Sequence, residues 1–514
     1  MRRGVGPWGR ALLVFLLVGA VCLLPSRGVS GHERPRRPEG RHEETRGGHG
    51  DREKKGHVNG HDGEHVKNHH EEKGHRADHG VEGHREPGRR GDSPEQQGRQ
   101  LVVRFHCNAC HLVSEEIKHE HHGGHEQIAP NLSFEGDKVR PEWLFDFLKG
   151  PHRVRPWLGA RMPNFRLTDR EALALTEHFI TDLRDRTLAP LPGRFRYRTQ
   201  NLQETLKAGA RLVSEDYLDC FTCHQLGDRK PQGDPDEWGP DLALASGRLR
   251  PEWIVRWLMD PQQLQPGTKM PTYFSDESSG PEDVLGGDEG RQIIALRDYL
   301  LNLGPDTISS RYAEAKKRYP DITTGEGWWL MQTLNCGGCH DVGRMHERHE
   351  VAPPLAHAGS RVRRQWLVDF LLRPTVIRPV GYIVGAPARM PDFRLSRQEA
   401  EAITAFLMSQ KMPKMPRWWR AAPQASVVEE GRALYQTWNC TSCHRWGDRS
   451  PGGPIAAQFE GPDLSRVGQR LKPDHLLFWL KGGSGTVDTH PIVPTFGLSD
   501  NELQALVAYL MTRR

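Results

Sequence analysis

The sequence predicts an all-α protein made of four consecutive, similar domains behind a long polar N-terminal segment. One cysteine–histidine motif occurs four times, at wide spacing, along the 514 residues. Each copy is flanked by segments in which apolar residues recur at i, i+3 and i+4, the spacing of an amphipathic helix. Length alone suggests about three domains, and the internal repeats raise that number to four.

Composition narrows the class of protein. Hydrophobic residues make up 36% and charged residues 27% of the chain, and the mean hydropathy of −0.69 argues against a polytopic membrane protein. The net charge is +5, but four of the 71 basic residues fall in the first 30, which leaves 67 against 66 acidic residues. This balance argues against a strongly basic nucleic-acid binder. Nine cysteines are too few for a disulfide scaffold.

Residues 1–30 are predicted to be an export signal. Arg2, Arg3 and Arg10 precede an apolar run at 11–24, and small residues follow at 28–31. The run is shorter than the ~20 residues of a membrane span. We therefore expect a cleaved leader, with an uncleaved anchor as the alternative. The mature protein is expected to be exported, in the periplasm or at the outer face of the cytoplasmic membrane.

Residues 31–95 have few large apolar side chains and are predicted to be disordered, because they cannot bury enough surface to offset their conformational entropy. Eleven histidines make this segment a candidate site for divalent Zn, Cu or Ni; the alternative is a solvated tether. They are His32, His42, His49, His57, His61, His65, His69, His70, His75, His79 and His84. A second, smaller cluster contains His119, His121, His122 and His125.

Eight of the nine cysteines fall into four C-x-x-C-H motifs. Two thiols at i and i+3 can each form a thioether to a haem vinyl group, and the adjacent histidine then binds the iron. Zinc binding would leave the histidine after each pair without a role, and a thioredoxin-like centre would need βαβ patterns that are absent. The motif residues are Cys107, Cys110 and His111; Cys220, Cys223 and His224; Cys336, Cys339 and His340; and Cys440, Cys443 and His444.

The remainder of each repeat follows one layout. A helix marked by a glycine precedes the motif, an A/G-P-x-L string follows it, and a tryptophan- or leucine-centred helix comes next. A methionine–proline pair follows in three repeats, and a last amphipathic helix, such as 168–183 or 499–510, closes the unit. The glycines are Gly98, Gly209, Gly327 and Gly431, the prolines are Pro130, Pro240, Pro353 and Pro462, and the methionines are Met162, Met270 and Met390.

This pattern resembles the class I c-type cytochromes over roughly residues 96–514. The resemblance implies four small all-α domains, each around one covalently attached haem c, at 96–190, 200–305, 320–412 and 425–514. It also implies that the carbonyl of each proline accepts a hydrogen bond from the iron-binding histidine, which fixes the orientation of the ring. The three methionines would be the second axial ligands.

Spacing divides the four units into two kinds. The candidate ligands lie 51 residues apart from His111 to Met162 and 50 apart from His340 to Met390. In units two and four the distance is 46 residues, from His224 to Met270 and from His444 to His490. These distances indicate that a two-haem module was duplicated, so interface residues should recur between the halves. We expect His490 to ligate the fourth iron; the alternative is an open site there.

The sequence therefore predicts a tetrahaem electron carrier without catalytic residues. Its partners would be other redox proteins, including a membrane quinol-oxidising or terminal reductase complex, and nucleic acid is not expected. A reductase of nitrite, nitric oxide or peroxide that uses an open fourth haem is the enzymatic alternative. A metal-buffering protein built around the histidine-rich segment would leave the haems unexplained.

Overall fold

The computed structural model describes residues 92–111, 113, 129–157, 161–196, 201–274, 280–305, 308–340, 352–377, 389–412, 423–451, 460–482 and 496–514. Over these ranges the protein is all-α, with isolated bridges and no extended strand. None of the helices in the described part of the chain has the length and apolarity of a membrane span. The predicted leader and the histidine-rich segment up to residue 91 lie outside the described residues.

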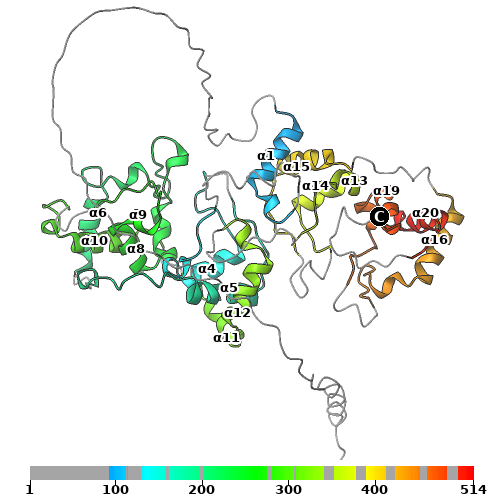
Figure 1. The fold of residues 1–514 in the computed structure, drawn as a ribbon. Coiled ribbons are helices and arrows are strands. Elements are labelled where there is room, and N and C mark those ends of the chain that lie inside the picture. Colours follow the sequence, from blue (N-terminus) through cyan, green and yellow to red (C-terminus); the bar gives the residue numbers. More distant parts are fainter. Residues whose placement is uncertain are drawn as a thin grey trace, which may run out of the picture. The chain divides into compact units, whose positions relative to one another are not determined.

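The helices are short, and 3-10 turns connect several of them (Figure 1). The α-helices are α1 (Pro94–Arg104), α3 (Glu135–Lys138), α4 (Pro141–Lys149), α5 (Asp169–Asp182), α6 (Leu202–Leu212), α7 (Ala245–Arg248), α8 (Pro251–Met259), α9 (Pro261–Leu264), α10 (Glu289–Leu301), α11 (Arg311–Arg318), α12 (Thr324–Thr333), α13 (Ala358–Arg361), α14 (Arg364–Leu372), α15 (Arg397–Ser409), α16 (Ala425–Thr437), α18 (Val467–Arg470), α19 (Pro473–Leu480) and α20 (Asp500–Met511). The 3-10 helices are η1 (Cys107–Ala109), η2 (Gly193–Arg196), η3 (Cys220–Thr222), η4 (Pro235–Glu237), η5 (Leu242–Leu244), η6 (Leu285–Gly287), η7 (Cys336–Gly338) and η8 (Cys440–Ser442).

Capping residues in the sequence mark helix ends that agree with the predicted ones. The predicted helix 168–183 is α5, whose N-cap Thr168 forms a capping box with Glu171. The predicted helix 499–510 is α20, and Ser499 caps it in the same way with Glu502. The first helix, α1, begins at Pro94 after the N-cap Ser93, two residues before the predicted start of the first domain.

Two of the four motifs lie in bodies that are continuous in sequence. We name each body by the histidine of its motif. The His224 body (191–304) packs α6 against α10 around one apolar cluster, and the His444 body (423–514) packs α16 against α20 around another. The predicted domains 200–305 and 425–514 cover nearly the same stretches of chain.

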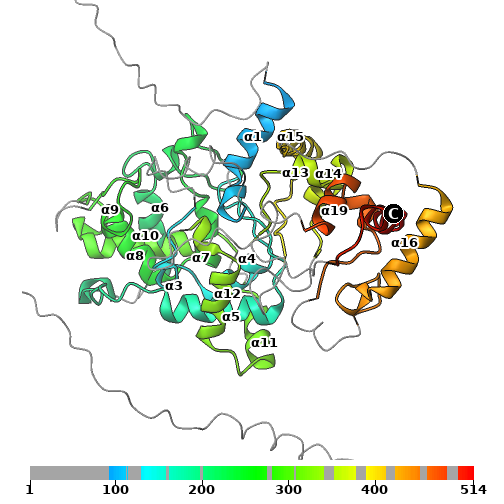
Figure 2. The ribbon, with the colours of Figure 1, turned by 45° about the vertical axis from the view of Figure 1, so that its right-hand side comes forward.

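The other two bodies exchange their N-terminal segments. Helix α1 packs against α15, and α12 packs against α5, as Figures 1 and 2 both show. The His111 body therefore joins 92–113 to 352–412, and the His340 body joins 129–183 to 311–340. The prediction of consecutive domains at 96–190 and 320–412 is wrong in this respect. In both bodies a first helix still packs against a last helix, but the first helix comes from one unit and the last helix from the other.

A glycine at each helix crossing explains why the helices approach so closely. A Cβ added at Gly98 would lie 1.9 Å from the carbonyl oxygen of Ala402, and one at Gly327 would lie 2.1 Å from that of Ala174. Equivalent crossings join Gly209 to Ala295 and Gly431 to Ala505 within single units. The four glycines that mark the first helices in the sequence are thus the residues at which first and last helices cross.

Candidate haem-attachment sites

All four C-x-x-C-H motifs have the same backbone conformation. A residue in the left-handed region directly precedes the first cysteine and turns the chain, and a 3-10 helix then begins at the first cysteine and has the second as its C-cap. In each motif the histidine N–H donates to the carbonyl of the first cysteine over 2.9–3.0 Å. The left-handed residues are His106, Asp219, Asn335 and Asn439, with φ between 44° and 55°. A single local geometry therefore presents both thiols and the imidazole at every site.

Each motif histidine bonds to the carbonyl of one of the four predicted prolines. Within one unit, the Nδ1 atoms of His224 and His444 lie 2.9 Å from the oxygens of Pro240 and Pro462. The other two bonds cross between units. His111 Nδ1 lies 2.7 Å from the oxygen of Pro353, and His340 Nδ1 lies 3.0 Å from that of Pro130. The prolines are those that the sequence indicated, but the expected pairing within units one and three is wrong.

These bonds determine which ring nitrogen can bind a metal. A carbonyl only accepts, so Nδ1 must carry the proton, and a neutral ring then has its lone pair on Nε2. Burial lowers the pKa of His111 to about 4, although its bond to Pro353 acts in the opposite direction. Burial also lowers the pKa of His224 and of His340. These three rings are therefore neutral at physiological pH and suited to ligate iron.

Two glycines fit directly against the histidine rings of the continuous bodies. A Cβ at Gly239 would lie 2.5 Å from Cε1 of His224, and one at Gly461 would lie 2.6 Å from Cε1 of His444. The N–H of each glycine also donates over 2.7 Å to the carbonyl of the second cysteine of its motif. The G-P-D-L string thus packs against the ring and binds it at the same time.

None of the eight motif cysteines, all within the described ranges, forms a disulfide. Burial raises the pKa of Cys107 and of Cys336 to about 12, and that of Cys220 and of Cys440 to about 11. Such thiols are protonated and chemically quiet. This argues against a redox-active C-x-x-C pair.

Three candidate methionines pack against the apolar cluster that also receives a motif cysteine. Met270 shares its cluster with Cys220, and the indole N–H of Trp257 lies 2.9 Å from its sulfur. In the exchanged bodies the partners cross again. Met162 shares a cluster with Cys336, and Met390 shares one with Cys107. Each of these two methionines thus lies in the cluster of the other unit's motif, whereas the sequence paired Met162 with His111 and Met390 with His340. His490 lies outside the described residues, as do His119, His121, His122 and His125.

The two exchanged bodies meet through equivalent residues of their R-M-P-[ND]-F-R-L strings. Asn164 and Asp392 exchange two backbone hydrogen bonds of 2.8 Å. Arg166 donates to the carbonyl of Met390 over 3.2 Å, and Arg394 donates to that of Met162 over 3.0 Å. Each arginine of the R-M-P-[ND]-F-R-L strings thus holds the candidate ligand of the other string. This explains why units one and three share that string.

Charged side chains and the motifs themselves complete this contact. Arg161 pairs with Glu399, and Arg389 pairs with Glu171, so each ion pair joins one string to a helix cap of the other unit. The side chain of Asn335 donates over 2.7 Å to the carbonyl of Ala109 inside the first motif. The motifs of His111 and His340 are consequently direct neighbours. The sequence analysis did not find these contacts, although the shared string was a signal for them.

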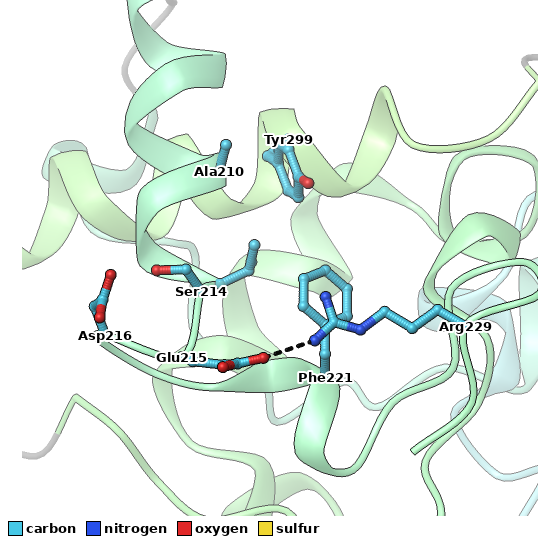
Figure 3. A pocket seen from close by; sticks show the side chains of 8 residues that line it. Ala210, Ser214, Glu215, Asp216, Phe221, Arg229 and Tyr299 are labelled. Carbon is cyan, nitrogen blue, oxygen red and sulfur yellow. Dashed lines mark hydrogen bonds and ion pairs between the residues drawn. The ribbon is translucent and has the colours of Figure 1, made fainter. Parts of the chain in front are cut away.

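One surface hollow beside the second motif has a different character (Figure 3). It measures about 290 Å³ and is lined by Phe221, Tyr299 and an ion pair of 3.0 Å between Arg229 and Glu215. The guanidinium of Arg229 covers the Phe221 ring at 4.5 Å. No motif histidine or candidate methionine lines this hollow. In the described part of the chain, no group of three acidic, histidine or cysteine side chains could hold a metal ion on its own.

The donor set as a whole fits a covalently bound haem: two thiols, a neutral imidazole with its tautomer fixed, and an apolar wall that carries a thioether sulfur. Two segments of the chain, residues 326–411 and 428–514, match the cytochrome c family model. No curated protein and no solved structure matches the chain. Cytochrome c proteins attach haem c covalently through C-x-x-C-H, and both matched segments contain that motif. These two segments, 326–411 and 428–514, are therefore identified as cytochrome c domains.

Proposed function

We propose that the chain is an exported tetrahaem c-type cytochrome that transfers electrons between redox partners. The observation that carries this proposal is the histidine–proline hydrogen bond at all four motifs, with lengths of 2.7–3.0 Å. It extends the donor set of the two matched segments to the motifs at 107–111 and 220–224. The same local turn, helix crossing and proline contact support one haem at each motif.

We assign the axial ligands from the contacts of the bodies. His111 pairs with Met390, His340 with Met162, and His224 with Met270. For the fourth haem we assign His444 and His490, since their spacing equals that of His224 and Met270. When bound, each haem supplies one iron that cycles between the ferric and ferrous states. The chain fixes the potential of each iron through the second ligand, the histidine hydrogen bond and burial.

Six-coordinate ligation favours a carrier over an enzyme. An iron held by histidine and methionine has no open position for a small substrate, so its role is to accept and donate electrons. An open fourth haem would instead allow reduction of nitrite, nitric oxide or peroxide. The absence of a methionine–proline pair in unit four favours this second candidate. Low-temperature electron paramagnetic resonance separates the two, because an open ferric haem gives a high-spin signal.

The export signal predicted at residues 1–30 supports a location outside the cytoplasm. We propose that the protein works in the periplasm or at the outer face of the cytoplasmic membrane. Its partners would be redox proteins, including a membrane quinol-oxidising or terminal reductase complex. The eleven histidines of residues 31–95 would bind divalent metal ions as a separate property of the N-terminal segment.

The mass of the matured full chain tests the haem number, and a spectroelectrochemical titration tests the ligands. We expect four porphyrin additions, four one-electron steps and the spectrum of methionine-bound iron. The variant C336A/C339A should lose one addition, and C220A/C223A should also lose one. Fewer than four additions in the unsubstituted chain would refute the tetrahaem proposal. Spectra without methionine-bound iron would refute the ligand assignment.

A further inference from the structure

The His340 body and the His224 body meet at a short antiparallel contact. Val139 and Leu249 form an isolated bridge. The N–H of Arg140 donates to the carbonyl of Arg248 over 2.8 Å, and the N–H of Arg250 donates to that of Lys138 over 2.9 Å. The guanidinium Nε atoms of Arg140 and Arg250 donate to backbone carbonyls across the same contact. Arg140 and Arg250 thus join the two bodies through both backbone and side-chain hydrogen bonds.

The His111 body and the His444 body meet in the same way. Val362 and Leu471 form the bridge. The N–H of Arg363 donates to the carbonyl of Arg470, and the N–H of Lys472 donates to that of Arg361, both over 2.9 Å. This recurrence confirms that interface residues repeat between the halves of the chain. A [KR]-[VL]-[RK] string precedes the second helix of each unit, at 138–140, 248–250, 361–363 and 470–472. These strings form the two contacts between bodies.

The three contacts order the bodies. His224 is linked to His340, His340 to His111 through the exchanged pair, and His111 to His444. This order differs from the order of the motifs along the chain, because units one and three have exchanged their motifs. In the chain order, the bridge at Val139 and Leu249 would join the motifs of His111 and His224.

Each of these two contacts, at Val139–Leu249 and at Val362–Leu471, also places two half-buried cations near each other. Arg248 lies near Lys138, and burial and this like charge lower the pKa of Lys138. Arg470 lies near Arg361, and burial and that charge lower the pKa of Arg470 to about 10. The Nε atoms of Arg248 and Arg470 are both buried without a hydrogen-bond partner. Glu135, which pairs with Lys138 over 3.3 Å, is the acid beside the first pair.

Two indoles add donors to the first contact. Trp157 and Trp238 lie edge to face at 5.4 Å, and the Nε1 atoms of both are buried without a partner. Trp238 directly precedes the G-P string that binds His224. Arg155 lies near the ring of His224, and Arg361 lies near that of His111. Cations and N–H donors in such surroundings are stabilised when a carboxylate accepts their hydrogen bonds.

We propose that the haems lie in the order His224, His340, His111, His444. At each of the two contacts described above, the pair of neighbouring cations would bind the propionates of the haems on both sides of that contact. Lys138 and Arg248 would serve the first two haems, and Arg361 and Arg470 would serve the last two. This inference rests on the proposed tetrahaem function. Its consequence is that the haems of His224 and His444 are the ends of the electron path, with the exchanged pair between them.

The variant R248Q tests the order through the haem potentials. A buried cation favours the ferrous form, since reduction removes one positive charge from the haem. We expect R248Q to affect two of the four haems, those of His224 and His340. For each of them, the ferric-to-ferrous ratio at a fixed potential should rise about tenfold, which is a drop in midpoint potential of about 59 mV. The variant R470Q should shift the other two. No shift in either variant would overturn the propionate assignment.

Haem-deleted backgrounds identify which haems move. In C336A/C339A, R248Q should shift one remaining haem, and in C107A/C110A it should still shift two. The reverse result would overturn the order. If a deleted chain does not fold, M162H and M390H mark single haems by their lower potential, and R248Q should shift the marked haem only in M162H. Fewer than four haems in the unsubstituted chain would refute the proposed function instead, which keeps the two failures distinct.

Discussion

The exchanged pair and the two continuous bodies use the same motif in two different ways. In the His224 body, the proline at position 240 and the methionine at position 270 come from the unit that carries the motif. In the His111 body, both corresponding residues come from more than 200 positions later in the chain. The comparison teaches that the haem-binding parts are interchangeable between units. Among the described residues, the exchanged bodies are joined by the hydrogen bonds between Asn164 and Asp392 and by the two R-M-P-[ND]-F-R-L strings.

The helix crossing provides the largest test of this comparison. Replacing Gly98 with valine should lower the free energy of unfolding of the His111 body by about 3 kcal/mol, because the side chain would collide with the backbone of α15. The control is Gly247→Ala, since a Cβ there meets nothing within 4 Å. Urea unfolding followed at the haem absorption measures both. Loss of methionine ligation at the haem of Met162 in G98V, with that of Met390 intact, would contradict the exchange.

The ion pair between Arg161 and Glu399 gives the next largest effect. The Arg161 side chain is 10% exposed and that of Glu399 is 25% exposed, so removing one partner leaves a poorly solvated charge. We expect Glu399→Gln to cost about 2 kcal/mol of unfolding free energy. The exposed pair of Arg432 and Glu429 is the matched control, and Glu429→Gln should cost much less than Glu399→Gln. Equal costs would show that the exchanged interface carries no special weight.

Short-range signals explain how much of this could be predicted. The helix caps, the four motifs, the prolines and the three methionines all depend on neighbouring residues, and the structure places them as parts of such sites. The exchange could not be predicted, because Gly98 and Gly327 occupy equivalent places in their units, and nothing in the local sequence says which last helix each one crosses. Pro130 and Pro353 are likewise equivalent acceptors. The duplicated spacing did predict that contacts recur, and the bridges at 139 and 362 bear this out.

The His444 body differs from its counterparts at one buried position of the second helix. His475 stands where the other units have tryptophan. Burial, together with Arg361 and Arg470, lowers its pKa from 6.5 to about 3. Since the folded pKa is depressed, the unfolded chain takes up the proton first. Stability is therefore full above pH 6.5 and falls as the pH drops toward 3.

Replacing His475 with phenylalanine should remove this part of the pH dependence. Between pH 6 and pH 4 the slope of unfolding free energy should become smaller by about 1.4 kcal/mol per pH unit. Urea titrations of both proteins at several pH values measure the slope. An unchanged slope would mean that His475 is protonated in the folded body.

The smallest expected effect concerns the contact between the two neighbouring motifs. Asn335→Gly keeps the left-handed backbone but removes the hydrogen bond to Ala109, so it should cost about 1 kcal/mol. Asn439 occupies the same position in the His444 body, and its side chain contacts Thr441 of its own motif. Asn439→Gly should therefore cost less than Asn335→Gly. Equal losses in thermal unfolding would contradict a special role for Asn335.

The exchange of ligands between units one and three is the central claim, and one set of spectra tests it most directly. In the C107A/C110A chain, which lacks the haem of His111, Met162→His should convert one of the remaining haems from methionine to histidine ligation. Met390→His in the same chain should leave the spectra of all three haems unchanged. The opposite result, with Met390 and not Met162 affecting the remaining haems, would contradict the account.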